Sequence, residues 1–190
     1  MKALTSIVAV LAVAHCCQAR AEQELQITPR LGFGVIKVDP GVLRFDNADL
    51  GDDNEADSLD AGVGISYVTP FALMFEIGLQ YQGNVSFGTF DDLSFEERYA
   101  AVGFQIEFGN GFRLTPKVGR TRWRLRNEEG IFLNPGPEEV EVLKGYEDFW
   151  EVSFTKTISQ YVSMGARYKS ADYDFGEVDS VMFVTTFGFR

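Results

Sequence analysis

The most regular feature of the chain is an alternation of apolar and polar residues with a period of two. In the stretch FALMFEIGLQYQ, residues 71–82, the side chains of Phe75, Ile77 and Leu79 are separated by glutamate and glycine. Successive side chains of a β-strand point to opposite faces, so this pattern predicts a strand with one apolar face and one polar face.

Seven further runs share this alternation, and the chain is therefore expected to form eight strands. They cover residues 25–38, 59–68, 71–82, 99–108, 112–126, 149–157, 161–169 and 178–190. The connections between them alternate in length, with tight turns such as Gly109-Asn110-Gly111 following long segments. Short turns at one rim and long connections at the other are typical of an up-and-down membrane β-barrel.

The long connections are acidic. Residues 46–60 hold seven acidic residues and no basic one, and further acidic clusters lie at 90–97, 137–148 and 171–179. The first segment invites a calcium site, although it lacks the ligand spacing of a calcium-binding loop, and a solvated loop explains it equally well. We expect four acidic external loops.

The composition of the two faces indicates which one meets the surroundings. The polar faces carry mostly Gly, Ser, Thr and Gln with a few charges of both signs, whereas the apolar faces are uniform and rich in aromatic residues. Small residues and paired ions suit a narrow lumen, and lipid accommodates the apolar faces. We therefore expect an apolar exterior around a polar interior. A soluble lipocalin-like barrel that binds an apolar ligand would need the reverse arrangement.

Aromatic residues near the ends of the expected strands are candidates for two interfacial girdles. They are Phe71, Tyr81, Phe108, Phe112, Trp123, Trp150, Tyr161 and Tyr168.

The N-terminus has the pattern of a secretory signal peptide. Lys2 precedes an apolar run over residues 7–14, and the small-x-small motif Ala19-Arg20-Ala21 ends the segment. The apolar run is about half as long as the ~20 residues of a membrane-spanning helix. We expect residues 1–21 to be removed and residues 22–190 to form one barrel domain.

Removal of this segment limits the chemistry of the mature chain. It takes away His15, Cys16 and Cys17, so no disulfide, Cys/His zinc site or histidine base is left. We accordingly expect neither enzymatic activity nor a cofactor or metal. It also takes away Lys2 and Arg20, which changes the formal net charge from −11 to −13 and disfavours nucleic acid as a partner.

Charged residues on the polar faces should point into the lumen. They are Arg30, Glu76, Glu107, Arg113, Lys117, Glu151, Arg167 and Lys169. Charges are costly in a narrow interior of low dielectric unless they are matched and hydrogen-bonded. These residues are therefore expected to form a salt-bridged plug.

A row of arginines, at positions 120, 122, 124 and 126, can be placed in two ways. The apolar positions change parity near Gly119, and a β-bulge there would turn Arg122 and Arg124 into the lumen, where they join the charge network. Without the bulge the row faces outward at the level of lipopolysaccharide phosphates, which arginine binds well. We favour the inward arrangement.

Taken together, these features resemble the small OmpA/OmpX-type outer-membrane β-barrel family over the whole mature region. The signal peptide, the eight amphipathic strands, the alternating loop lengths and the ending FVTTFGFR carry the resemblance, with Phe189 penultimate. It implies an all-β, eight-stranded antiparallel up-and-down transmembrane barrel in a Gram-negative outer membrane, with both termini in the periplasm. It also implies a monomer that contacts outer-membrane lipid and lipopolysaccharide, and an assembly machinery that reads the C-terminal strand.

The function expected on this basis is non-catalytic. The leading hypothesis is a structural or surface-exposed protein with acidic external loops, acting in envelope integrity, adhesion or host contact. The alternatives are a small-molecule binder or narrow conduit, and the soluble lipocalin-like binder.

Overall fold

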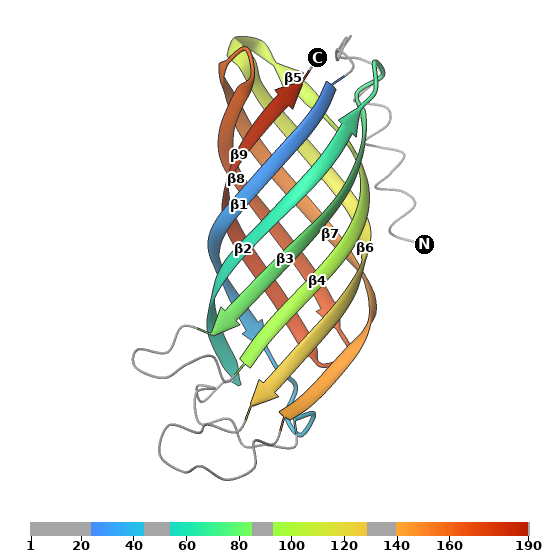
Figure 1. Ribbon diagram of the computed structural model, residues 1–190, viewed down its shortest axis with the longest axis vertical. Helices are drawn as coiled ribbons and strands as arrows, with labels where there is room; N and C mark the ends of the chain where they lie inside the picture. Colours follow the sequence, from blue (N-terminus) through green and yellow to red (C-terminus); the bar gives the residue numbers. More distant parts are fainter. Residues whose placement is uncertain (1–23, 44–53, 85–92, 129–139, 190) are drawn as a thin grey trace.

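The computed structural model describes residues 24–43, 54–84, 93–128 and 140–189, and these form a barrel of β-strands (Figure 1). The strands are β1 (Glu24–Lys37), β2 (Glu55–Val68), β3 (Leu73–Asn84), β4 (Leu93–Phe104), β5 (Ile106–Phe108), β6 (Phe112–Glu128), β7 (Val140–Ser159), β8 (Val162–Tyr173) and β9 (Gly176–Phe189). In this part of the chain, no helix has the length and apolar character to cross a bilayer. The expected signal peptide, residues 1–21, lies outside the described residues.

The strands close on themselves with simple antiparallel neighbours. Apart from β4 and β5, each strand pairs with the next along the chain; β1 pairs with β9, and β4 and β5 both pair with β6. β4 and β5 are separated only at Gln105, whose backbone N–H donates to the carbonyl of Ala72 at 2.8 Å, so they form one wall strand. The predicted fold, an eight-stranded antiparallel up-and-down barrel, is confirmed.

The two ends of the barrel differ in how the strands are joined. At one end, called the turn end, short turns join β2 to β3, β5 to β6 through the 3₁₀ turn η1 (Gly109–Gly111), and β7 to β8. At the other, the loop end, three connections include residues 44–53, 85–92 and 129–139, which lie outside the described residues together with most of the predicted acidic loops. The fourth, at 171–179, was wrongly expected to be a loop: only Asp174 and Phe175 separate β8 from β9.

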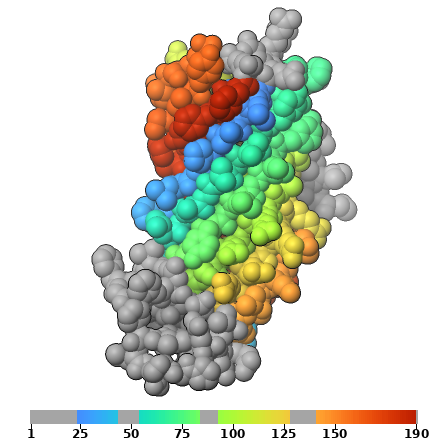
Figure 2. Space-filling view, in the orientation of Figure 1, coloured from blue at the N-terminus to red at the C-terminus, as the bar shows by residue number. Residues whose placement is uncertain are grey.

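The apolar faces of the strands form the outer wall, across which β1 to β4 run diagonally in Figure 2. Phe75 and Ile77 are 50% and 62% exposed, whereas Gln80 and Gln105 are each 3% exposed. The bulky apolar face therefore points outward and the amide side chains point inward. This is the orientation expected from the sequence, and it rules out the soluble barrel with reversed faces.

The interior consists of two layers. The half nearer the turn end is polar and charged, as expected. The half nearer the loop end holds an apolar cluster, which the sequence analysis did not anticipate. Its buried members are Ile36, Val38, Ala56, Leu93, Phe95, Tyr99, Ala101, Trp123, Leu125, Phe149, Ala171, Tyr173, Phe175 and Val178.

The expected aromatic girdles are largely present on the outer wall. Six of the eight candidates are exposed there: Phe71, Tyr81, Phe108, Trp150, Tyr161 and Tyr168. Phe112 is half-buried. The eighth, Trp123, was wrongly placed in a girdle: it is 3% exposed and packs inside the barrel against Tyr173 and Phe175.

No β-bulge occurs at Gly119. The pairing of β6 with β4 and β7 continues through Gly119 without a shift. Gly119 instead makes room for a ring, because a Cβ there would lie 2.6 Å from the ring of Phe149. The parity of apolar residues changes because the lumen itself turns apolar toward the loop end, so that Trp123 and Leu125 point inward.

An arginine in the middle of the apolar wall should destabilise the barrel. We expect Ile77→Arg to lower the free energy of unfolding by about 2–4 kcal/mol, because the guanidinium would be held near the bilayer midplane. Tyr81→Arg, four residues nearer the loop end on the same face of β3, should cost only about 0–1 kcal/mol. Equilibrium denaturant unfolding in phospholipid vesicles measures both. Equal losses would contradict a lipid-facing wall.

Candidate functional site

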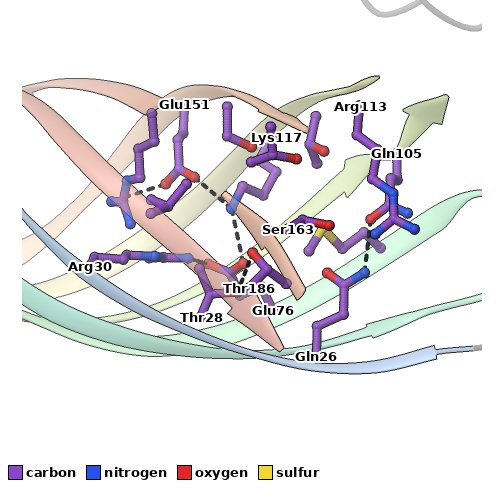
Figure 3. A pocket seen from close by; sticks show the side chains of 16 residues that line it. Gln26, Thr28, Arg30, Glu76, Gln105, Arg113, Lys117, Glu151, Ser163 and Thr186 are labelled. Carbon is purple, nitrogen blue, oxygen red and sulfur yellow. Dashed lines mark hydrogen bonds and ion pairs between the residues drawn. The ribbon is translucent and has the colours of Figure 1, made fainter. Parts of the chain in front are cut away.

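The centre of the charged layer is Glu76 on β3. Its carboxylate forms an ion pair with Arg30 of β1, and one of its oxygens accepts a hydrogen bond from Lys117 of β6 at 2.9 Å (Figure 3). The Tyr99 hydroxyl of β4 donates to the other oxygen at 2.8 Å. One carboxylate thus joins four strands across the lumen.

A second carboxylate, Glu151 of β7, extends the network. Its two oxygens lie 2.5 Å from Nζ of Lys117 and 3.0 Å from Nη2 of Arg167 on β8. Both contacts are close ion pairs without the angles of hydrogen bonds. Arg167 also donates to the side-chain carbonyl of Gln80 at 2.9 Å, which links β8 back to β3. The network therefore links β1, β3, β4, β6, β7 and β8 across the interior.

Toward the turn end, a smaller set of polar contacts closes the lumen. Gln26 donates to Glu24 at 2.9 Å and to Gln105 at 3.0 Å. Arg113 lies 3.6 Å from Glu24 and 2.8 Å from Glu107, whose side chain is partly exposed. Arg113 and Glu107 thus pair with each other near the rim.

Toward the loop end, the charged layer merges into the aromatic cluster. Lys169 pairs with Glu97, which also accepts a hydrogen bond from the Tyr173 hydroxyl at 2.5 Å. The Lys169 ammonium lies 4.6 Å from the ring centre of Phe149 and 5.7 Å from that of Tyr99. Such cation–π contacts stabilise a charge next to an apolar surface.

The buried charges are balanced. Among the described residues, five cations and five carboxylates have buried side chains. They are Arg30, Arg113, Lys117, Arg167 and Lys169, with Glu24, Asp60, Glu76, Glu97 and Glu151. Asp60 accepts hydrogen bonds from Ser58 at 2.8 Å and Gln82 at 2.9 Å. Matched signs and hydrogen bonds make burial of so many ions tolerable.

Inward glycines make room for the network. A Cβ on Gly78 would lie 2.3 Å from the Tyr99 hydroxyl oxygen, and one on Gly64 would lie 2.7 Å from Nη2 of Arg30. Both positions belong to the polar faces predicted from the sequence. Their lack of a side chain lets Tyr99 and Arg30 reach Glu76.

Little space is left among these side chains. The cavity between Gln26, Arg30, Glu76, Lys117 and Glu151 has a volume of about 20 Å³, enough for roughly one water molecule. No cluster of three or more His, Cys, Asp or Glu residues arranged to hold a metal occurs in the described ranges. The arrangement can hold the wall strands together and exclude solutes from the lumen.

Of the ten residues proposed for the network, Lys169 lies toward the loop end, where it pairs with Glu97, and the other nine fall into three groups. Arg30, Glu76, Lys117, Glu151 and Arg167 meet in the middle of the lumen. Arg113 and Glu107 pair near the turn end. The placement of Arg122 and Arg124 in the lumen was wrong: without a bulge at position 119, both are exposed on the outer wall.

Several inward polar residues were not proposed for the network. They are Glu24, Asp60, Gln80, Glu97 and Tyr99. The alternation of the sequence did indicate that these side chains point inward, because each lies on the polar face of its strand. Gln80, for example, shares the parity of Glu76, and Glu24 that of Arg30.

Comparison with known proteins adds structural likeness only. No protein-family model matches the chain, and no curated protein matches its sequence. Among solved structures, Neisserial surface protein A is similar, with a TM-score of 0.62 and 9% identity over 87% of this chain and 97% of that one. Ail, the attachment invasion locus protein of Yersinia pestis, is similar with a TM-score of 0.59 and 12% identity over 89% and 100%. The fold is thus that of the small OmpA/OmpX-type outer-membrane barrels, which confirms the resemblance.

Removing one carboxylate from the network should destabilise the barrel strongly. We expect Glu151→Gln to cost about 3–5 kcal/mol of unfolding free energy, because Lys117 and Arg167 would then share too little negative charge in a buried site. Denaturant unfolding in detergent or lipid measures the loss.

The matched control lies on the outer face of the same strand. Asp148 has a side chain that is 78% exposed, and we expect Asp148→Asn to change stability by less than about 1 kcal/mol. If both variants were equally stable, the lumen charges would not be holding the wall together.

Proposed function

We propose that this chain is a non-conducting outer-membrane protein that acts through its outer surface, as neither a pore nor an enzyme. The observation that carries the proposal is the filled lumen. Paired charges occupy one half and an aromatic cluster the other, with about 20 Å³ of free space in the charged layer. A narrow conduit would need a continuous polar path, and the aromatic cluster blocks it.

The apolar outer wall supports a location in a membrane. Exposed side chains such as Leu31, Phe33, Phe154 and Phe183 are between 50% and 73% accessible, which a monomer in water would not tolerate around its whole circumference. Closed barrels are one of two structures that satisfy all backbone hydrogen bonds in lipid. Export by a signal peptide at residues 1–21 belongs to the same proposal.

The loop end is the part that would meet other molecules. Its described wall has an acidic side on β2, β8 and β9, where Glu55, Asp57, Asp172 and Glu177 are exposed. The acidic segments that follow β1, β3 and β6 in sequence would extend this surface. Envelope integrity, adhesion and host contact are roles for such a surface. The similar protein Ail is named for attachment and invasion, and one of its structures contains the heparin analogue sucrose octasulfate.

Absence of catalysis is part of the proposal. Without residues 1–21 the chain has no histidine or cysteine, so common nucleophile–base pairs cannot form. The carboxylates that could act as acids or bases in the lumen are held in ion pairs or, at Asp60, in hydrogen bonds, and are closed to substrates.

Planar bilayer recording of the purified mature barrel tests the filled lumen. We expect no steady conductance, because neither layer leaves room for hydrated ions. A variant in which long side chains of both layers are replaced by short ones serves as the opened control. Its substitutions are Glu76→Ser, Lys117→Ser, Glu151→Ser, Arg167→Ser, Trp123→Ala and Phe149→Ala. A stable open channel of hundreds of picosiemens in the wild-type protein would overturn the proposal.

Labelling on intact cells tests the orientation. The expected mature chain has no cysteine, so single cysteines can be placed at Asp174 in the β8–β9 turn and at Gln160 in the β7–β8 turn, both exposed. We expect a membrane-impermeant maleimide to label Asp174→Cys and to spare Gln160→Cys until the cells are lysed. The opposite pattern would place the loop end in the periplasm.

A further inference from the structure

The outward-facing arginines form part of a basic recess on one side of the wall, near the loop end. Arg98 of β4, Arg122 and Arg124 of β6 and Lys144 of β7 line it together with a single acid, Glu96. The recess therefore has a net positive charge. The exposed acids on β2, β8 and β9 lie elsewhere on the wall.

Two of these cations face each other directly. Arg98 and Arg122 are cross-strand partners in the pairing of β4 with β6. Like charges at directly opposed positions destabilise a sheet. Within the described part of the chain neither arginine forms an ion pair, whereas Arg120, one row nearer the turn end, lies 3.8 Å from Asp148. The pair of arginines is arranged for a negative group that the described part of the chain does not supply.

The same cross-strand row continues into apolar wall. From β2 to β7 it contains Val63, Leu79, Arg98, Arg122 and Tyr146. Because the strands are tilted, a cross-strand row that starts on β2 lies progressively closer to the loop end, at the bottom of Figure 1, as it passes through β3 and β4. The apolar members therefore lie deeper in the membrane than the cations. A depression lined by Ile65, Ile77, Leu79, Arg98, Arg122 and Tyr146 joins the two parts.

We propose that this recess binds a multiply acylated, phosphorylated glycolipid of the outer leaflet, that is, the lipid part of lipopolysaccharide. Its acyl chains lie over Val63, Ile77 and Leu79, and its phosphates lie between Arg98 and Arg122. Arginine suits this role because its planar fork pairs with phosphate through two hydrogen bonds.

The number of cations selects a ligand with several negative charges. Four cations face one acid in the recess, and residues two apart on a strand are separated by roughly 7 Å. A single phosphodiester headgroup cannot reach all of them. A disaccharide with a phosphate at each end, attached to several acyl chains, can.

The proposed lipid site rests on the proposed function, because it requires the loop end of the barrel to lie at the outer leaflet. Its test is independent of conductance and orientation, because binding is measured on purified protein. Native mass spectrometry of the full mature barrel in detergent, titrated with diphosphoryl hexa-acyl lipid A, measures retained lipid. Monophosphoryl lipid A and phosphatidylglycerol are titrated in parallel.

We expect the wild-type barrel to retain one diphosphoryl lipid A in preference to the other two lipids. The double variant Arg98→Gln/Arg122→Gln should bind it more than about tenfold more weakly, because charge-assisted hydrogen bonds are lost. The control Lys156→Gln removes an exposed cation of the outer wall near the turn end and should bind like the wild type. Unchanged binding by the double variant, an equal loss in the control, or equal retention of phosphatidylglycerol would each overturn the proposal.

The stability of the barrel, measured with and without lipid A, provides a second test whose expected result differs from that of a folding defect. In zwitterionic lipid alone, the double variant should be at least as stable as the wild type, because two opposed positive charges are gone. Added diphosphoryl lipid A should stabilise the wild type and leave the double variant unchanged, because a ligand stabilises the state that binds it. If the double variant fails to fold, Arg98→Gln and Arg122→Gln are measured singly, and full binding by both would refute the site.

Discussion

The structure depends on the narrowness of an eight-stranded barrel. Its lumen is only wide enough for side chains, so an inward residue on one strand meets residues from the strands opposite. Arg30 of β1 therefore reaches Glu76 of β3, and Lys117 of β6 bridges Glu76 and Glu151. Water cannot enter to solvate an unmatched ion, so each buried charge requires a partner of opposite sign or, as at Asp60, hydrogen-bond donors that stabilise the carboxylate. The balance of five cations and five carboxylates in the described lumen follows from this constraint.

The same narrowness explains the second layer. Toward the loop end the interior is filled by rings instead of ions, and glycines face them: Gly119 faces Phe149, and Gly145 faces Trp123. Inward apolar residues displace polar ones to the outside on β6, where the arginine row lies above the apolar belt. The aromatic filling of the lumen and the basic recess on the wall are thus two consequences of one change of parity in the sequence.

Much of this arrangement could be read from the alternation. The orientation of Phe75, Ile77 and Gln80 followed from period two together with the small, weakly charged polar faces, and the same parity placed Glu76, Lys117 and Glu151 in one lumen. The sequence could not show where the lumen turns apolar, because parity alone does not separate a bulge at Gly119 from a regular strand whose inward residues become apolar. The short β8–β9 turn was missed because acidic residues such as Asp172 and Glu177 also occur on strand positions above the membrane.

The central claim is that the lumen holds ionised, mutually paired side chains with almost no water between them. Nitrogen-15 NMR of the lysine side chains of the barrel in nanodiscs tests it most directly. The account predicts that Lys117 and Lys169 appear at neutral pH as ammonium groups whose protons exchange slowly with solvent, with contacts to Glu151 and Glu97. Neutral amines, or ammonium protons that exchange as fast as those of the exposed Lys156, would contradict it.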